Sequence, residues 1–247
     1  MRNLPTITKN LLLANIIVYF LDALLVKYGV DLTTFAGLHY LQATGFRLWQ
    51  PFTYMFMHAN FTHLFCNMFA VLMFGPVLER EWGEKRFLIF YLVCGLGAAV
   101  FQEAVWAILI HQHVGGFDPE IIASWSNRFV TIGASGAVFG ILFAFGWLFP
   151  NIPMFILFIP IPIRARTLVI IYAAIELFAG FAQVSGFTAS DNVAHFAHLG
   201  GLVFGWLLIL WWKHGNDFFS NLFSKKDKDD DGRGRDFSGY HYHRNIE

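Results

Sequence analysis

The chain has 247 residues, of which 56% are hydrophobic and only 14% are charged. A soluble domain usually carries about 25% charged residues, so this composition argues against an ordinary soluble protein and predicts membrane spans. Basic and acidic side chains balance at 17 each, so nothing in the net charge indicates a nucleic-acid partner.

Six apolar segments, separated by polar breaks, are long enough to cross a bilayer. A membrane helix needs about 20 mostly apolar residues to cross about 30 Å of hydrocarbon. The short apolar stretch 152–163 is rich in proline, so we expect an interfacial or re-entrant segment there. The sequence thus predicts an all-α bundle of six transmembrane helices within residues 1–212. The spans are expected at roughly 11–30, 60–78, 86–110, 131–149, 166–184 and 194–212.

Basic residues predict the orientation of these spans. With the N-terminus in the cytoplasm, most of the 17 lysines and arginines fall on the cytoplasmic side, and the other side holds Lys27, Arg47 and Arg128. Both termini are therefore expected to be cytoplasmic. No convincing cleavage site follows the first span, so we expect the span to be retained. Without a clear organellar targeting segment, a bacterial-type plasma (inner) membrane is the expected location.

Residues 213–247 differ in character from the spans. They are charged and poor in aliphatic side chains, which is typical of a disordered cytoplasmic tail. Residues 227–232 follow the spacing of the first half of a calcium-binding loop, but Ser238 stands where that loop needs a bidentate glutamate. We therefore expect a solvated charge run here, and no metal.

Five other residues within or near the spans are expected to be structural. Cys66 and Cys94 lie in apolar stretches and are predicted to be small buried hydrophobic residues without a disulfide. Asp22, Glu103 and Glu176 are predicted to be hydrogen-bonding groups that face the bundle.

Three sets of polar residues remain, and polar side chains within a span are costly enough to mark functional sites. All three spans concerned run from the outside to the inside, and each set lies near the outer end. The catalytic candidates are therefore expected at a common depth of roughly 10 Å. The sets are His58, His63 and Asn67; the box Gly133-Ala134-Ser135-Gly136; and His195 with His198.

The residue types indicate a serine nucleophile. A serine hydroxyl needs an adjacent base, so Ser135 is predicted as nucleophile and His198 as the base. No acidic residue is placed to orient the histidine, which predicts a dyad supported by stacking of Phe139 on His198. His63 and Asn67 share one helix face and can donate to an oxyanion, together with the Ser135 backbone N–H.

Glycine spacing gives a reason for Ser135 and His198 to meet. Small residues four apart let two helix backbones approach closely, and such pairs follow both residues. Only His198 has glycines three and seven residues later, so it is preferred over His195 as the base. His58 is expected to hold a loop by hydrogen bonding. The glycine pairs are Gly136 with Gly140 and Gly201 with Gly205.

These motifs resemble the rhomboid family of intramembrane serine proteases over residues 45–212. The resemblance implies six helices around a water-filled cavity open to the outer side, with the fifth span as a lateral gate. It implies transmembrane protein substrates, cleaved in or near the bilayer, and Phe139 stands where the family can carry tyrosine. The motifs are His58-x4-His63-x3-Asn67, the Gly133–Gly136 box, Ala197-His198-x2-Gly201-x3-Gly205, Trp49-Gln50-Pro51 and Glu79-Arg80-Glu81-Trp82-Gly83.

Other classes of function remain open at this stage. A catalytically inactive relative could bind membrane proteins in quality control or trafficking, although it would be expected to lack Ser135 or His198. A channel or transporter would leave the glycine-serine box unexplained, and the two halves show no inverted repeat. A metalloprotease would need a His-Glu-x-x-His pattern, which is absent. The expected partners are membrane proteins and the bilayer, with no cofactor and no nucleic acid, and no pattern sets an oligomeric state.

Overall fold

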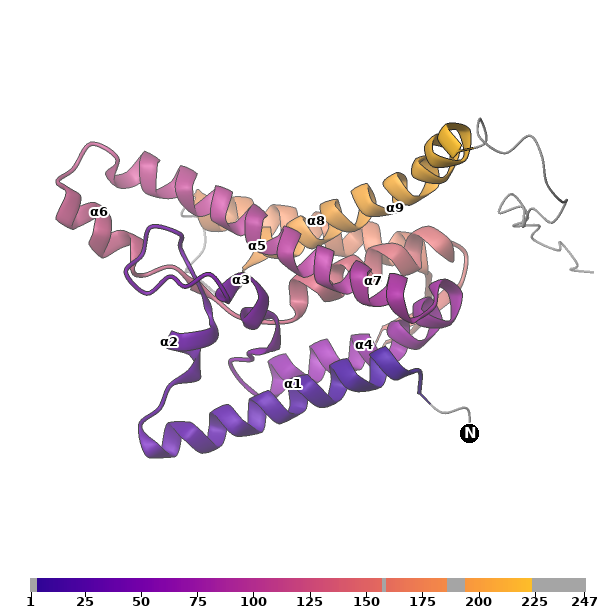
Figure 1. Ribbon diagram of the computed structural model, residues 1–247, viewed down its shortest axis with the longest axis horizontal. Coiled ribbons are helices and arrows are strands. Elements are labelled where there is room, and N and C mark those ends of the chain that lie inside the picture. Colours follow the sequence, from indigo (N-terminus) through magenta and orange to yellow (C-terminus); the bar gives the residue numbers. More distant parts are fainter. Residues whose placement is uncertain (1–3, 157–158, 186–193, 224–247) are drawn as a thin grey trace, which may run out of the picture. The chain divides into compact units, whose positions relative to one another are not determined.

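The computed structural model describes residues 4–156, 159–185 and 194–223, which are mostly helical (Figure 1). Five of the described helices are long and apolar enough to cross a membrane. Five of the six predicted spans therefore correspond to helices of spanning length. They are α1 (Thr6–Leu25, continued by the 3₁₀ turn η1, Val26–Tyr28), α4 (Phe61–Trp82), α5 (Glu84–Val114), α8 (Ala165–Val184) and α9 (His195–Phe223).

The fourth predicted span is shorter than expected. Helix α7 covers Ser135–Leu148, and its 14 residues extend only about 21 Å. The chain enters it through strand β2 (Val130–Thr131) and Gly133, whose φ of 133° is a conformation that side chains with a Cβ rarely adopt. Ser135 is thus the first residue of the helix, and not one turn inside it as the sequence suggested.

Two small antiparallel sheets qualify the all-α prediction. β1 (Leu38–His39) pairs with β2, with Leu38 opposite Thr131. The proline-rich stretch forms a hairpin of β3 (Pro153–Ile156) and β4 (Ile159–Arg164), where an interfacial or re-entrant segment was expected. The remaining short elements are α2 (Leu32–Ala36), α3 (Gln50–Thr53), the 3₁₀ turn η2 (Tyr54–Phe56) and α6 (Pro119–Ser126).

A buried carboxylate joins the first two long helices. Glu79 of α4 is 2% exposed and accepts hydrogen bonds from the backbone N–H of Ile7 at 2.8 Å and of Thr8 at 2.7 Å. The Thr8 hydroxyl adds a third bond at 2.7 Å. These are the unpaired N–H groups of the first turn of α1, where a negative charge is also favoured by the helix dipole.

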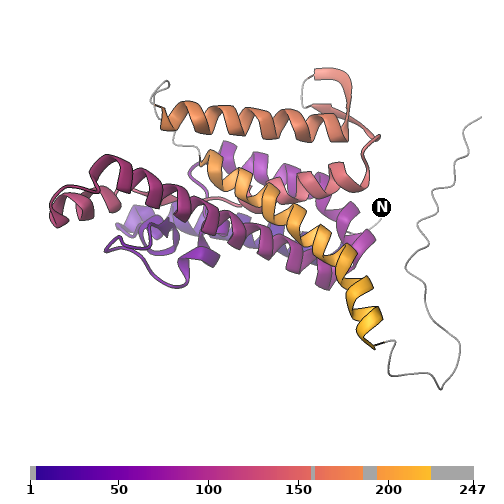
Figure 2. The ribbon, with the colours of Figure 1, turned by 90° about the horizontal axis from the view of Figure 1, so that it is seen from above.

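Helix α7 lies at the centre of the packing. It contacts α4, α5 and α8, and Figure 2 shows it beside α8 and α9. The two glycine pairs form its contact with α9, because a Cβ at Gly201 would collide with the carbonyl oxygen of Gly136. A Cβ at Gly205 would lie 3.4 Å from the Cα atom of Gly140. The glycines therefore bring the two backbones together, as their spacing predicts.

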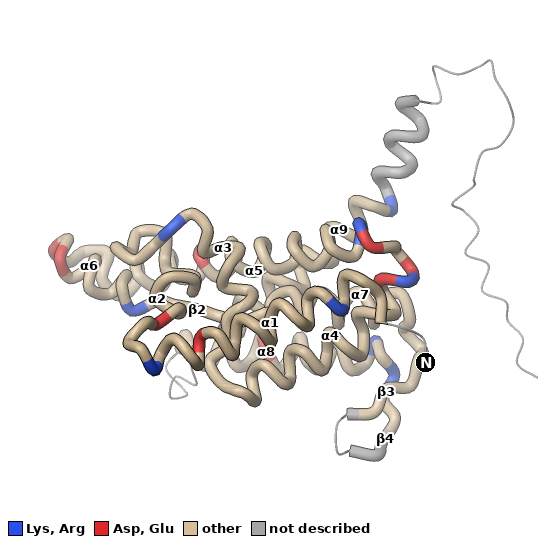
Figure 3. The backbone as a smooth tube through the Cα atoms, turned by 60° about the horizontal axis from the view of Figure 1, so that its bottom comes forward, with Lys and Arg blue, Asp and Glu red and all other residues tan. Residues whose placement is uncertain are grey.

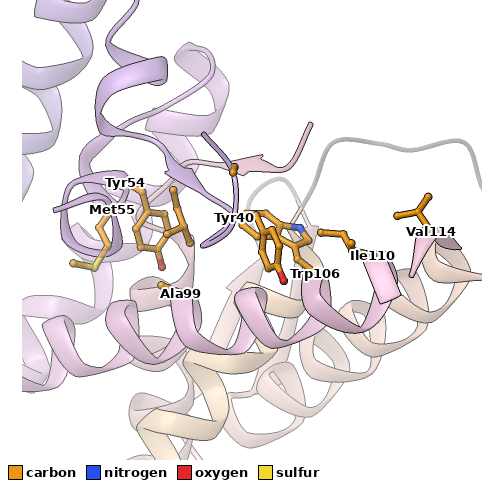
Figure 4. Packing of buried hydrophobic residues seen from close by; sticks show 9 residues of the cluster. Tyr40, Tyr54, Met55, Ala99, Trp106, Ile110 and Val114 are labelled. Atoms are coloured by element: carbon orange, nitrogen blue, oxygen red, sulfur yellow. The ribbon is translucent and has the colours of Figure 1, made fainter. Parts of the chain in front are cut away.

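A buried cluster attaches the connection between α1 and α4 to α5. Figure 4 shows Tyr40, Tyr54 and Met55 facing Ala99 and Trp106. The Tyr54 hydroxyl donates to the carbonyl oxygen of Gly95 at 2.7 Å. The Tyr54 carbonyl in turn accepts from the N–H of Gly133 at 2.9 Å, so this cluster also holds the chain that leads into α7.

Charge and exposure are distributed as expected for a bundle in lipid. Figure 3 shows most charged residues of the long helices towards their ends. Large apolar side chains on α1 and α8 are exposed, including Phe20 at 60% and Phe178 at 76%. Both cysteines are free, but only Cys94 is buried, because Cys66 lies on an exposed face of α4.

By its contacts the chain divides into Met1–Ile209 and Leu210–Glu247. Helix α9 continues to Phe223, so the predicted tail is helical in its first part. The rest of that tail, including the passage 227–238 that resembles part of a calcium loop, lies outside the described residues.

Candidate active site

The structure brings Ser135 and His198 into direct contact. Ser135 begins α7 and His198 lies in the first turn of α9, and the Ser135 Oγ atom is 2.7 Å from His198 Nε2. The distance is that of a strong O–H···N hydrogen bond, with the hydroxyl as donor. His198 is only 8% exposed, so the pair is largely shielded from water.

Phe139 supports the imidazole from one side. Its ring is stacked on that of His198, with the ring centroids 4.4 Å apart and the planes 9° from parallel. Phe139 itself makes an edge contact with Tyr172 of α8 at 6.3 Å. The stacking contact expected between Phe139 and His198 is therefore present.

His63 and Asn67 provide donors on the adjacent helix. The ring Nδ1 of His63 accepts from the backbone N–H of Ala59 at 3.4 Å, which leaves Nε2 as the protonated nitrogen. A Cβ at Gly133 would lie 2.7 Å from this Nε2, so the donor is directed at the glycine-serine box. Asn67 is 5% exposed, and its Nδ2 has no hydrogen-bond partner among the described residues.

The Ser135 backbone N–H completes this group of donors. The first N–H groups of a helix have no intrahelical partner, and Ser135 is the first residue of α7. Gly133 makes this possible, because a side chain there would strike His63 and would be strained by the positive φ. The candidate donors thus come from two packed helices, with His63 and Asn67 on α4 and the Ser135 N–H at the start of α7.

His58 plays a different part from the one expected. It is 3% exposed, and none of its ring nitrogens forms a hydrogen bond of ordinary geometry with the described residues. It instead makes an edge contact with the His63 ring, with the centroids 5.0 Å apart. Burial, reinforced by the neighbouring His63, lowers the pKa of His58 to about 4. His58 is therefore a neutral packing group at neutral pH.

The prediction that no acidic residue lies beside His198 is wrong. Glu176 of α8 places its Oε2 atom 2.9 Å from Nδ1 of His198 and 2.6 Å from Nδ1 of His195. The three residues are 8%, 8% and 6% exposed, in the order Glu176, His198 and His195. The sequence does show Glu176 as a carboxylate within an apolar span, which can mark a functional residue. No local pattern, however, indicates that it would contact the face of α9 that carries His198.

The other intramembrane acids bind backbone groups, as expected. Asp22 accepts from the N–H of Leu32 at 3.3 Å, and Glu103 accepts from the N–H of Leu41 at 2.9 Å. Both tie a spanning helix to the connection between α1 and α4. Neither makes a described contact with Ser135 or His198.

Comparison with known proteins identifies the family. Residues 45–213 match the Rhomboid domain family. The chain is 34% identical to the rhomboid protease AarA of Providencia stuartii over 142 residues, which is 55% of this chain and 48% of that protein. It is 33% identical to the putative rhomboid protease YdcA of Bacillus subtilis over 105 residues, covering 42% of this chain and 43% of that protein.

The similarity extends to plants, where RHOMBOID-like protein 1 of Arabidopsis thaliana is 29% identical over 163 residues, 65% of this chain and 33% of that protein. The chain spans about half or less of the length of these relatives. The apolar helices and the family match together make the chain an integral multi-pass membrane protein. It belongs to the rhomboid family, which confirms the resemblance seen in its motifs.

Proposed function

We propose that this chain is an intramembrane serine endopeptidase, with Ser135 as nucleophile and His198 as general base. The observation that carries the proposal is the 2.7 Å contact between Ser135 Oγ and His198 Nε2, on a ring stacked against Phe139. A serine hydroxyl hydrogen-bonded to a buried imidazole is the arrangement that activates serine for attack. Relatives that are named rhomboid proteases support the same activity.

The chemistry follows from the two side chains. His198 Nε2 accepts the proton as Ser135 Oγ attacks the scissile carbonyl, which forms a tetrahedral intermediate. The imidazolium returns that proton to the amine as the peptide bond breaks, and an acyl-serine remains. Water then attacks the ester with His198 again as the base, which releases the second product and restores Ser135.

The developing oxyanion needs donors that are already in place. We assign this role to the His63 Nε2–H, the Asn67 amide and the Ser135 backbone N–H. The unpartnered Nδ2 of Asn67 supports the assignment, because a buried donor without a partner is costly unless a ligand satisfies it. Removing one such donor costs roughly 10²–10³ in kcat in other serine proteases.

The substrates are proposed to be transmembrane proteins cleaved in or near the bilayer. Five helices of the described fold have the length to span it, and the site lies at the outer ends of α4, α7 and α9 by the expected topology. That topology has both termini on the cytoplasmic side of a bacterial-type plasma membrane. Fusion of a reporter enzyme to the C-terminus tests this topology. A reporter enzyme that is active only outside the cytoplasm should remain inactive in that fusion.

The main alternative is an inactive family member that binds membrane proteins. It is disfavoured because both Ser135 and His198 are present and in hydrogen-bonding contact. Cleavage of a membrane-anchored reporter by purified protein distinguishes the two. Ser135→Ala should abolish cleavage while expression and thermal stability stay at wild-type values, and cleavage retained by the purified variant contradicts the nucleophile assignment.

The choice of base is tested by chemical labelling. A fluorophosphonate probe should label wild-type Ser135, and His198→Ala should lose the label because the hydroxyl loses its base. His195→Ala is the comparison variant, since it removes an imidazole three residues away on the same helix and should reduce labelling far less than His198→Ala does. Labelling lost in the His195 variant and kept in the His198 variant would show that the base is misassigned.

A further inference from the structure

We infer that Glu176 is the third member of this catalytic group, a positioning residue that orients His198 and stabilises its protonated form. The inference rests on the proposed function and extends it from a dyad to a Ser135–His198–Glu176 triad. The residues come from three different helices, α7, α9 and α8 in that order.

Glu176, His198 and Ser135 follow one another in a row of close polar contacts. The Oε2 atom of Glu176 lies 2.9 Å from His198 Nδ1, and the opposite ring nitrogen, Nε2, lies 2.7 Å from Ser135 Oγ. A carboxylate oxygen this close to Nδ1 would repel a lone pair there, so the contact favours the tautomer that carries its proton on Nδ1. Nε2 is then unprotonated and can accept the Ser135 proton. The carboxylate therefore selects the ring tautomer that catalysis requires.

His195 is in hydrogen-bonding contact with the same carboxylate. Its Nδ1 lies 2.6 Å from the same Oε2, and its ring makes an edge contact with that of His198. Gly180, one turn after Glu176 on α8, allows this approach, because a Cβ there would lie 3.3 Å from the Cβ of His195. His195 thus holds Glu176 in place, which gives a structural role to the histidine that is not the base.

The spacing of this cluster is that of hydrogen bonds. Two ligands of a tetrahedral zinc ion at about 2.05 Å stand roughly 3.3 Å apart. The carboxylate oxygen is closer than this to both histidine nitrogens, at 2.6 and 2.9 Å. Protons shared between the three side chains fit these distances better than a metal ion does.

The role of Glu176 in the reaction is electrostatic. When the Ser135 proton moves to Nε2, His198 becomes an imidazolium, and the ionised Glu176 stabilises it without taking the proton. The cluster is buried, so the attraction is stronger than it would be in water. Once the proton passes to the leaving amine, His198 is neutral again and the bond to Glu176 remains.

The test measures reporter cleavage by the purified full-length Glu176→Gln variant. Gln keeps the size of the side chain but removes the charge, so kcat should fall about ten- to hundredfold, or roughly 1.4–2.7 kcal/mol at 1.36 kcal/mol per decade. KM should change less than about twofold, because Glu176 is not proposed to contact the substrate. The rate of fluorophosphonate labelling should fall in parallel with kcat.

Glu103→Gln is the matched control, a second intramembrane glutamate that binds a backbone N–H away from the site. Its kcat should stay within about twofold of wild type. A double-mutant cycle then separates chemistry from structure, because the slow labelling that prolonged exposure to the probe gives in a His198→Ala background should not fall further with Glu176→Gln. An equal drop in that background would mean that Glu176 acts only on the fold.

A wild-type kcat in Glu176→Gln, with cleavage still dependent on Ser135, would overturn the triad and leave the proposed function intact. If wild-type protein shows no Ser135-dependent cleavage, the proposed function itself fails. If the Gln variant does not fold, Glu176→Met replaces it in the test, because Met has a similar volume and no charged group. The Met variant is judged in the same way, by its kcat and by the dependence of cleavage on Ser135.

Discussion

The close backbone approach between Gly201 of α9 and Gly136 of α7 predicts a large effect of Gly201→Ala. The new Cβ would collide with the Gly136 carbonyl oxygen and lie 2.7 Å from its carbonyl carbon. Both are backbone atoms, which cannot rotate away as a flexible side chain could. An ordinary contact needs about 3.5–4 Å, so the two helices must separate by about 1 Å or more.

That separation acts directly on the proposed catalytic pair. Ser135 lies one residue before Gly136 and His198 three residues before Gly201, so their 2.7 Å contact would lengthen beyond hydrogen-bond reach. A misplacement of about 1 Å can cost about 10²-fold in rate. We expect kcat/KM for reporter cleavage to fall about a hundredfold, with a loss of about 1–3 kcal/mol of stability from overpacking.

Two other glycines give a graded control. A Cβ at Gly205 would lie 3.1 Å from Phe90 Cζ and 3.4 Å from Gly140 Cα, so Gly205→Ala should have a smaller effect. Gly116→Ala meets open space and should leave kcat/KM and the melting temperature unchanged. The assay is cleavage of a membrane-anchored reporter, with thermal unfolding in parallel. Activity of Gly201→Ala within twofold of Gly116→Ala would refute the argument.

Three further changes have expected outcomes. Glu79→Ala removes three hydrogen bonds to the start of α1 and should lower the free energy of unfolding by about 2–3 kcal/mol, measured by denaturation, without changing kcat. Phe139→Leu removes the ring stacked on His198 and should reduce kcat about 3- to 30-fold, whereas Phe139→Tyr should retain it; equal rates for Leu and Tyr would contradict the stacking role. His58 has a pKa lowered from 6.5 to about 4, so the unfolded chain binds the extra proton first and stability should fall by about 3 kcal/mol as the pH drops from 6.5 to 4. His58→Phe should remove that part of the pH dependence of the melting temperature, and an unchanged dependence would show that another group is responsible.

Much of this protein is determined by the sequence alone, because the information is local. Membrane residence follows from composition, and the long helices follow from uninterrupted apolar runs. The pairing of Ser135 with His198 could be predicted because glycines at a four-residue spacing mark the faces of two helices that approach closely. Phe139 lies one turn from Ser135, so its position beside the same site followed from helical periodicity.

The tertiary structure decided where α7 begins and what lies behind His198. The helix starts at Ser135 because Gly133 has a positive φ and its N–H is held by Tyr54, a residue 79 positions earlier that no local pattern connects to it. Glu176 appeared in the sequence as one intramembrane acid among three. Only the packing of α8 against the start of α9 placed it, and not Asp22 or Glu103, at 2.9 Å from the His198 imidazole, because the way in which two helices face each other depends on contacts between residues far apart in the chain.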